Sequence, residues 1–416
     1  MAGDSVIVVG AGHIGIACAH YLRHDGHDVT VIDRASVGGA CSHANCGVLV
    51  PSHVLPLTEP GAIRTGLKSL FQPRAAFRVT PQLRPALYRW MFEFGRRCTH
   101  RQMLKAAAVL DEILRASMTE YEQLMSESSM QCEWHNDGML FVFRTEEALK
   151  KFGRTDTMLA SEFGLAARHI DGSELPDFEP ALLEGLAGAY YYEDDQHLRP
   201  DRFNAAWSQR LIDGGVAFIE DCGVESVKKT GGQISGLQTS QGLTTADRYV
   251  FATGAWSAEF EDALGCRIPV EPGKGYSVTM TRPEIMPSHP ILVPEKHIGI
   301  SPFDSSYRIA SMMEFSGFDD SIPRSRIEQL KDSARPYLKT PEGPAEEDTW
   351  YGWRPMTWDS LPIIGRVPRL SNALLATGHN MLGLSLAPMT GKAIADLVAE
   401  RPSDLPLDAL SPARFS

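Results

Sequence analysis

The sequence has no long apolar run, no excess of positive charge and no second copy of its one nucleotide-binding motif. Its 416 residues include 52 Asp or Glu and 40 Lys or Arg, which gives a formal net charge of -12. This balance argues against nucleic acid as a partner, because nucleic acid selects clustered Lys and Arg. No run reaches the roughly 18 apolar residues that span a bilayer. The most apolar stretch, residues 47–57, is expected to be able to contact a membrane peripherally.

The cysteines form no recognisable pair. All seven are scattered, and none belongs to a CxxC pair or to a His/Cys metal spacing. We therefore expect no metal site. We expect the protein to lie in a reducing compartment, the cytoplasm, with peripheral attachment to the inner face of the membrane as the other expected location. Residues 1–4 lead directly into an apolar strand, which leaves no room for a cleavable signal peptide.

A dinucleotide fingerprint opens the chain. The first 34 residues predict, in order, a strand over 5–9, a tight turn, a helix to about His24 and a strand over 29–32. The turn carries Gly10, Gly12 and Gly15, which permit close approach of pyrophosphate to the backbone and to the helix N-terminus. Asp33 stands where a carboxylate binds a ribose hydroxyl, and it disfavours the 2′-phosphate of NADP.

Only one dinucleotide is expected. The chain has no second GxGxxG, so the two-nucleotide plan of disulfide reductases does not fit. A loop of small residues, 39–47, follows the second strand and suits passage beside a flat ring system. Two distant segments complete the same fold: strands between 215 and 257 that close on ATGAWS, and a strand, Gly-rich turn and helix between 372 and 400.

The remaining sequence predicts a second region that contains both a helix and strands. Residues 102–130 read as a helix with one apolar face, which indicates packing rather than a cofactor site. Segments near 137–144, 188–193 and 275–313 are typical of strands, and we expect them to form a second sheet that covers the ring system.

Taken together, the motifs resemble the FAD-dependent D-amino-acid oxidase superfamily, most closely its bacterial D-amino-acid dehydrogenase and glycine-oxidase branches. The resemblance spans nearly the whole chain and rests on VIVVGAGHIG with Asp33, SHANCG, ATGAWS, KGYS, GWRPMTWDSLPIIG and ATGHNMLGLSLAPMTG. It implies an α/β fold with a Rossmann-like FAD-binding domain made of discontinuous segments (1–50, 196–262 and 352–416). An α+β substrate-binding domain with an antiparallel sheet would comprise 51–195 and 263–351.

The resemblance also implies the cofactor and its contacts. FAD is expected to be non-covalent, because the C-terminal cysteine to which some relatives attach flavin is missing after Cys266. The residues implied at FAD are Gly10, Gly12, His13, Ile14, Gly15, Asp33, Arg34, Ser42, Asn45, Gly47, Val224, Thr253, Gly254, Trp256, Gly378, His379, Met381, Leu382, Gly383 and Leu384. Backbone atoms of Val224 would hold adenine, and His379 would contact flavin through its backbone.

Three residues are implied at the substrate. Arg354, in the G-x-R-P position and beside Trp353, would bind a carboxylate with its planar guanidinium, although an internal ion pair or a stacked surface arginine is the alternative. Tyr276 would bond the carboxylate or amine, or else pack in the core. His53 would face the pocket, or else serve the structure only.

The reaction implied is hydride transfer from the Cα of a free D-amino acid to flavin N5, which gives an imine and then a 2-oxo acid. Glycine oxidases carry a second arginine where this chain has Asn380 and Met381, which suggests a larger substrate, such as hydroxy-D-proline. A quinone, an electron-transfer protein or oxygen would accept the electrons. The alternatives are a sarcosine- or glycine-type amine oxidase that uses oxygen, and a non-catalytic electron-relay subunit that binds FAD.

Overall fold

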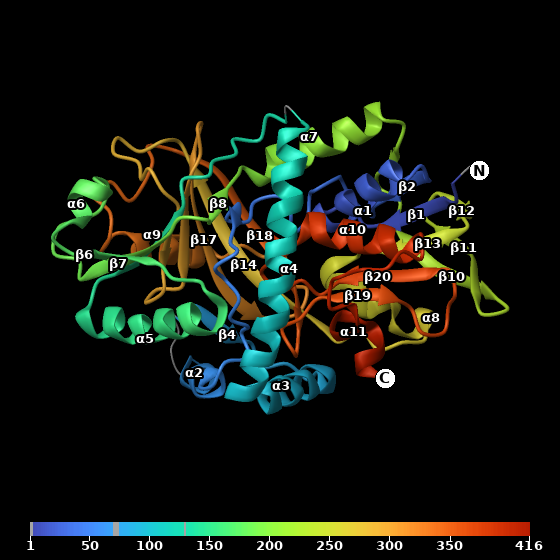
Figure 1. Ribbon diagram of the computed structural model, residues 1–416, viewed down its shortest axis with the longest axis horizontal. Helices are drawn as coiled ribbons and strands as arrows, with labels where there is room; N and C mark the ends of the chain where they lie inside the picture. Colours follow the sequence, from blue (N-terminus) through green and yellow to red (C-terminus); the bar gives the residue numbers. More distant parts are fainter. Residues whose placement is uncertain (1–2, 70–74, 129) are drawn as a thin grey trace.

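The computed structural model describes residues 3–69, 75–128 and 130–416, and its core is a six-stranded sheet (Figure 1). In spatial order the strands are β19 (Ile363–Arg366), β20 (Ala373–Thr377), β13 (Arg248–Phe251), β1 (Ser5–Val9), β2 (Asp28–Ile32) and β9 (Ala217–Ile219). Every neighbouring pair is parallel except β19 and β20. Distant parts of the chain thus build one Rossmann-like sheet, which confirms the predicted fold class.

Three helices cover one face of this sheet in successive layers. They are α1 (His13–His24), α10 (Ala387–Val398) and α4 (His100–Ser126). Polar contacts join the layers: the Tyr121 hydroxyl donates to the Leu384 carbonyl (2.7 Å), and Glu120 accepts from Tyr21 (2.7 Å) and pairs with Lys392. The predicted apolar face of α4 is buried, which confirms its packing role; it consists of Leu110, Leu114, Met118, Tyr121 and Met125.

A second, nine-stranded sheet lies beside the first (Figure 1). Its order is β18 (Glu346–Thr357), β14 (Val270–Met280), β17 (Tyr307–Phe315), β16 (Ile298–Pro302), β15 (Ile291–Val293), β5 (Met139–Phe143), β7 (Gly188–Tyr192) and β6 (Arg168–Asp171), with β4 (Phe77–Val79) paired to β17. The sheet is antiparallel except at β15/β5 and β17/β4. The strands expected near 137–144, 188–193 and 275–313 all belong to it.

The smaller elements connect the two sheets or flank them. The helices are α2 (Ala62–Ser69), α3 (Pro85–Arg97), α5 (Glu146–Phe163), α6 (Leu175–Phe178), α7 (Pro200–Asp213), α8 (Glu261–Leu264), α9 (Arg324–Ala334) and α11 (Leu407–Leu410), with 3-10 turns η1 (Gly254–Phe260) and η2 (Pro412–Phe415). A three-stranded sheet contains β10 (Val224–Thr230), β11 (Gln233–Thr239) and β12 (Gly242–Thr244), and β3 (Val48–Leu49) pairs with β8 (Gln196–His197).

Two elements do not follow the domain boundaries expected from the sequence. β18 runs across the expected boundary at residue 352, so its hydrogen bonds to β14 place Arg354 in the nine-stranded sheet. α4 falls within the segment expected to form the substrate domain, yet it packs on α10 of the FAD-binding part. Both differences arise because long elements cross from one part of the molecule to the other, which local sequence patterns do not reveal.

The expectation that residues 47–57 contact a membrane is wrong. Leu49, Val50 and Val54 are at most 4% exposed and belong to the main hydrophobic core. The run is apolar because its side chains pack in this core. Among the described residues, no helix has both the length and the apolar character needed to cross a bilayer.

Candidate active site

The glycine turn between β1 and α1 is shaped for a phosphate group. Gly10 has φ +108°, and Gly15 lies so close to the Gly10 carbonyl oxygen that a Cβ there would collide with it. Gly12 caps α1 without any side-chain hydrogen bond, and the first turn of α1 contains no acidic residue. The positive end of the helix dipole is therefore uncompensated, which fits a pyrophosphate.

Residues for the adenosine end meet at the end of β2. The Asp33 carboxylate accepts from the backbone N–H of Ala11 (2.6 Å) and of Ala35 (2.9 Å), which places it against the glycine turn. Burial raises the pKa of Asp33, and these two hydrogen bonds oppose the rise. The Arg34 guanidinium stacks 4.6 Å from the ring centre of Trp256. Gly223, next to Val224, faces the side chain of Arg34.

The loop after β2 is tied to the start of α1. Ser42 Oγ accepts from the His13 backbone N–H (3.0 Å), and Asn45 Nδ2 lies 3.2 Å from His13 Nε2. Asn45 Oδ1 in turn accepts from the Gly47 N–H (2.9 Å), where φ is +72°. Burial lowers the pKa of His13 to about 4, so its ring is neutral and serves as a hydrogen-bonding support. These bonds fix the backbone of residues 42–47 beside the phosphate site.

The Gly-rich turn after β20 forms the side of the candidate site opposite the 42–47 loop. The Asn380 side chain accepts from the Thr357 N–H (2.9 Å) and donates to the Gly378 carbonyl (2.9 Å). His379 is buried with Nε2 2.9 Å from Thr390 Oγ1, and burial lowers its pKa to about 3. A neutral, hydrogen-bonded imidazole of this kind agrees with a backbone role. Met381 is 49% exposed at the tip of the turn.

The carboxyl ends of β1, β2, β13 and β20 therefore converge. Ser257 links two of them, because its hydroxyl contacts Thr253 Oγ1 (2.8 Å) and Thr377 Oγ1 (2.6 Å). The predicted cofactor residues at these ends are Gly10, Gly12, His13, Ile14, Gly15, Asp33, Arg34, Thr253, Gly254, Trp256, Gly378, His379, Met381, Leu382, Gly383 and Leu384. Ser42, Asn45 and Gly47 lie in the adjoining loop, and Val224 begins β10. The arrangement fits one extended dinucleotide, although each individual contact stays a prediction.

Arg354 reaches from β18 across β14. Its guanidinium lies against Gly275, where any Cβ would collide with it, and one nitrogen donates to the Met312 carbonyl (2.8 Å). Among the described residues, no carboxylate lies within ion-pairing distance of Arg354. Burial raises the pKa values of Cys41 and Cys46 in the loop, and the positive charge of Arg354 opposes the rise. The internal ion pair considered above is therefore not formed.

The carbonyl that holds Arg354 is in an unusual backbone conformation. Met312 has φ +66°, a left-handed value that is rare for a side chain of this size. It lies at an irregularity in the pairing of β14 with β17, between Lys274 and Tyr276. The irregularity turns the carbonyl of Met312 towards Arg354, and strained positions of this kind are concentrated at functional sites.

The sheet surface around Arg354 is made of small residues. By strand register, Gly275, Ser277, Ala310 and Gly299 share the face from which the Arg354 side chain projects. The loop lies across this face: Cys46 Sγ sits over Gly299, and Ser301 Oγ donates to the Cys46 carbonyl (2.5 Å). Small side chains allow the Arg354 guanidinium and the loop to lie directly on the sheet.

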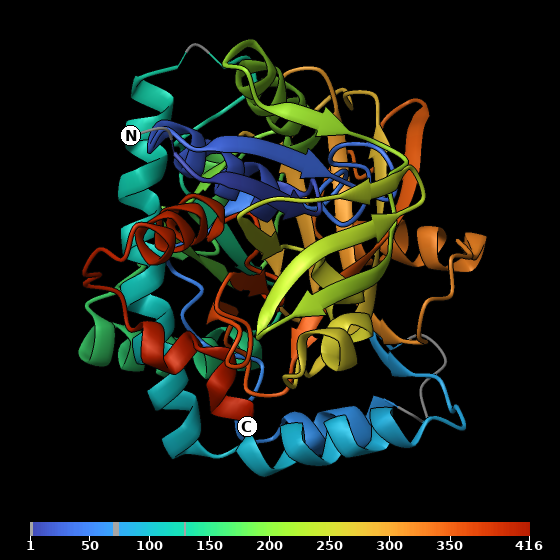
Figure 2. The same ribbon diagram turned by 90° about the vertical axis from the view of Figure 1, so that its right-hand side faces the viewer.

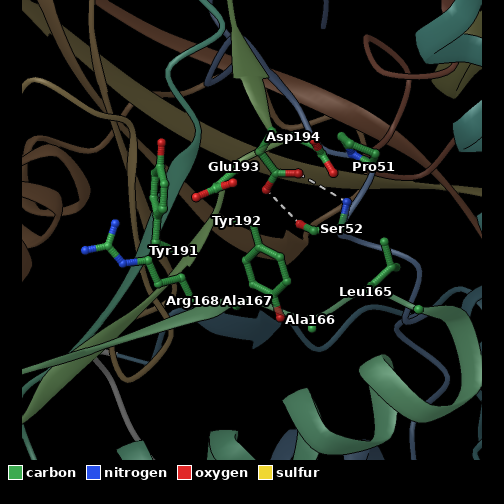
Figure 3. A pocket seen from close by; sticks show the side chains of 12 residues that line it. Pro51, Ser52, Leu165, Ala166, Ala167, Arg168, Tyr191, Tyr192, Glu193 and Asp194 are labelled. Carbon is green, nitrogen blue, oxygen red and sulfur yellow. Dashed lines mark hydrogen bonds between the residues drawn. The ribbon is translucent and has the colours of Figure 1, made fainter.

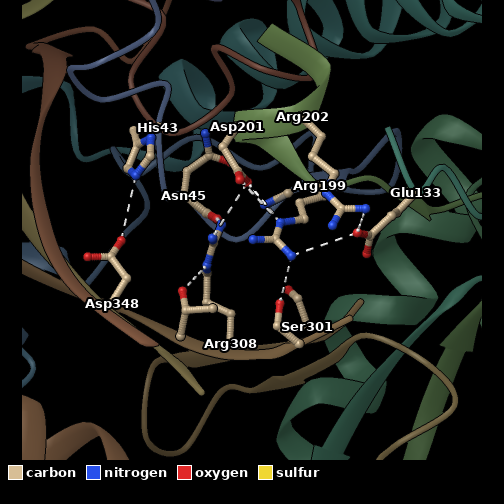
Figure 4. Close-up of polar contacts among 12 residues, drawn as sticks. His43, Asn45, Glu133, Arg199, Asp201, Arg202, Ser301, Arg308 and Asp348 are labelled. Carbon is tan, nitrogen blue, oxygen red and sulfur yellow. Dashed lines mark hydrogen bonds and ion pairs between the residues drawn. The ribbon is translucent and has the colours of Figure 1, made fainter. Parts of the chain in front are cut away.

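One functional candidate was not predicted. Arg308 on β17 is 2% exposed, and it donates to the Asn45 carbonyl (2.8 Å) and to Thr279 Oγ1 (2.9 Å) (Figure 4). Burial lowers its pKa to about 10, while the carboxylate of Asp201, 3.8 Å away, opposes this. Arg308 thus fixes the loop to the sheet. A lone arginine in the apolar run Tyr307–Phe315 was the sequence signal for it.

Tyr276 is not brought to Arg354. Its side chain projects from the other face of β14, is 1% exposed, and donates its hydroxyl to Glu314 (2.7 Å). Tyr276 therefore packs in the core, and the prediction that it contacts substrate is corrected. Trp353 also lies on that other face, because successive residues of a strand alternate, so it does not enclose Arg354 as its position in the sequence suggested.

His53 lies on the same sheet face as the small residues, farther along. Its ring is 5.4 Å from that of Phe141, which the register aligns with Leu292 and Gly299. Burial lowers the pKa of His53 to about 4, so the imidazole is neutral. A role for His53 at the substrate stays a prediction.

The segment after the loop is anchored by a buried acid. Asp195 accepts from the Ser52 backbone N–H (3.1 Å) and hydroxyl (2.7 Å) at a cavity of about 340 Å³ (Figure 3). Burial raises the pKa of Asp195 from 3.8 to about 7. The folded protein thus holds this proton more tightly than the unfolded chain does.

Asp195 should make stability depend on pH. Because its folded pKa is raised, it contributes stability below about pH 4 that is lost as the pH rises to about 7. We expect the free energy of unfolding of the wild type, relative to Asp195→Asn, to fall across this window and then to level off. Urea denaturation of both proteins from pH 4 to 8 measures it. Asp194→Asn, at the exposed neighbour, should retain the slope; parallel curves for wild type and Asp195→Asn would contradict the assignment.

Comparison with known proteins identifies the family and the fold. The family model described as DAO, FAD dependent oxidoreductase, matches residues 5–397. The chain belongs to this family. Its cofactor is FAD, and the resemblance inferred from the sequence motifs is confirmed.

Relatives of this DAO-family oxidoreductase are similar over their full length. A curated protein named D-amino acid dehydrogenase, from Agrobacterium fabrum, is 30% identical over 99% of this chain and 100% of its own. Crystal structures of glycine oxidase share the fold. The Geobacillus kaustophilus enzyme has a TM-score of 0.80 at 23% identity, with all of both chains covered, and the Bacillus cereus enzyme has 0.75 at 21%, with 97% of each covered.

Proposed function

We propose that this protein is an FAD-dependent dehydrogenase that oxidises the CH–NH bond of a free D-amino acid. The observation that carries the proposal is Arg354, a guanidinium without a carboxylate partner in the described chain, held over a floor of small residues beside the predicted flavin loop. An amino-acid carboxylate is a natural bidentate ligand for it. The name of the Agrobacterium relative supports the choice of substrate class.

The candidate substrate is larger than glycine and has a ring, as in hydroxy-D-proline. Two features support this choice. Asn380 is uncharged and its amide already bonds Thr357 and Gly378, so it adds no cationic contact to the carboxylate beside that of Arg354. Met381 adds an apolar, half-exposed side chain at the same turn. A single carboxylate contact with an apolar wall favours a substrate that gains affinity from ring burial.

In this proposal the residues of the chain bind the cofactor and orient the substrate. Bound FAD would supply the two-electron acceptor, held without a covalent bond by the glycine turn, Asp33 and the loop. Arg354 orients the carboxylate and thereby aims the Cα hydrogen. The buried imidazoles of His53 and His379 are neutral and poor bases at pH 7, so the substrate amine is expected to bind neutral.

Anaerobic flavin bleaching tests the proposal. We expect the purified protein to contain FAD that acid precipitation releases, and its visible absorbance to be bleached by one D-amino acid but not by the L-isomer. The panel should contain D-proline derivatives, linear D-amino acids, glycine and sarcosine. Bleaching by sarcosine or glycine with peroxide formation in air would favour an oxygen-using amine oxidase. Bleaching by dithionite alone would favour an electron-relay subunit.

A further inference from the structure

Positive charge is concentrated in one segment of this acidic sequence. Residues 61–101 contain nine Lys or Arg and a single acidic residue, Glu93, whereas acidic residues outnumber basic ones 52 to 40 in the whole chain. The described residues of the segment, 61–69 and 75–101, include α2, β4, α3 and the start of α4. α2 and α3 lie along the lower edge of the molecule in both ribbon views (Figures 1 and 2). We call the outer side of these two helices the α2–α3 surface.

Large apolar side chains protrude from the same surface. Leu83 is fully exposed, Phe92 is 64% exposed, Tyr88 51% and Ile63 49%. They are four of the ten large hydrophobic side chains that are exposed among the described residues. α3 does not need them for folding, because its inner side already buries Leu87 and Trp90 against the core. Clustered apolar exposure of this kind marks an interaction site.

Several arginines in this segment have no compensating carboxylate among the described residues. Arg64, Arg89 and Arg101 are exposed, and none of them forms an ion pair with any residue that the structure describes. Arg96 and Arg97 are paired with Glu93, and Arg84, just before α3, is paired with Glu271. Exposed aromatic rings beside unpaired guanidinium groups suit the interface of an anionic bilayer. Aromatic rings lie at the headgroup level there, and cations attract acidic lipids.

We propose that the α2–α3 surface docks peripherally on an anionic phospholipid membrane. Tyr88 and Phe92 enter the headgroup region from the side of α3, and Arg64 and Arg89 contact lipid phosphates. The docking goes beyond the proposed function and does not depend on it, since the α2–α3 surface is separate from Arg354 and the cofactor residues. It would hold the enzyme beside an electron acceptor dissolved in the bilayer.

Vesicle flotation of the full-length holoenzyme tests the docking. We expect binding to vesicles of equal parts phosphatidylcholine and phosphatidylglycerol at low salt, and none to phosphatidylcholine alone. Arg64→Glu/Arg89→Glu should weaken partitioning at least about 30-fold, since each basic residue lost near the surface removes a factor of about five and each new carboxylate is repelled by the anionic lipid. Tyr88→Ser/Phe92→Ser should also weaken it. Arg210→Glu/Lys228→Glu makes the same charge change on α7 and β10, away from α3, and should bind as the wild type does (Figure 1).

The controls separate this proposal from the proposed function. All variants should keep their FAD and their rate of flavin reduction by substrate in vesicle-free buffer. The docking is overturned by absence of flotation, by equal binding to both vesicle types, or by an equal loss in the Arg210→Glu/Lys228→Glu protein. It is also overturned if light scattering shows a dimer that Tyr88→Ser/Phe92→Ser dissociates, because the surface would then join two copies of the chain.

Discussion

Replacement of Arg354 by Gln is expected to lower kcat/KM for the amino-acid substrate by roughly 100- to 1,000-fold, or about 3–4 kcal/mol of transition-state binding. The side chain has one internal hydrogen bond, to the Met312 carbonyl, and no described carboxylate neutralises it. Its remaining donors are therefore available to a ligand. Arg354→Lys keeps the charge but loses the planar fork, so we expect an intermediate loss. Steady-state kinetics with the amino acid found by flavin bleaching would measure both.

The matched control is Arg282→Gln. Arg282 is exposed and also donates to one backbone carbonyl, that of Asp304 (2.7 Å), but it lies at the end of β14 away from the loop. Both glutamine variants should retain stoichiometric FAD and the wild-type midpoint of thermal unfolding. An unchanged kcat/KM for Arg354→Gln with full FAD content would remove the carboxylate assignment and leave the family assignment intact.

Replacement of Gly15 by Ala is expected to abolish FAD binding at micromolar cofactor concentrations. The added Cβ would collide with the Gly10 carbonyl oxygen. The Cβ position is fixed by the backbone of residue 15 and the oxygen is itself a backbone atom, so no side-chain rotation can relieve the collision. The turn must open, which moves the N-terminus of α1 away from the pyrophosphate site and costs about 1–3 kcal/mol of stability. Flavin fluorescence titration and thermal unfolding of the apoprotein measure the two effects.

Gly214→Ala serves as the comparison for this glycine. Gly214 ends α7 with φ -80°, and an added Cβ would come no closer than 3.3 Å to the Leu211 carbonyl oxygen. We expect wild-type FAD affinity and a change in stability within about 0.5 kcal/mol. If Gly15→Ala bound FAD as tightly as Gly214→Ala, the glycine turn would not be the pyrophosphate site.

The sequence by itself determined the nucleotide half of this protein. Strand, turn and helix around Gly10, Gly12 and Gly15 were predicted closely, because each of these elements depends on contacts between near neighbours in the chain. Asp33 could be placed for the same reason, since a strand end and a turn fix its position. The family resemblance followed from the order of such local motifs.

Tertiary structure alone decided which side chains share the substrate surface. Arg354 and Tyr276 both lie on neighbouring strands, but the register of β14 with β18 puts them on opposite faces, and a shift of one residue would have reversed this. Arg308 became a candidate only when β17 came under the loop, 263 residues away from Asn45 in the chain. Register and burial are set by contacts between distant segments, and a local pattern of residues does not contain them.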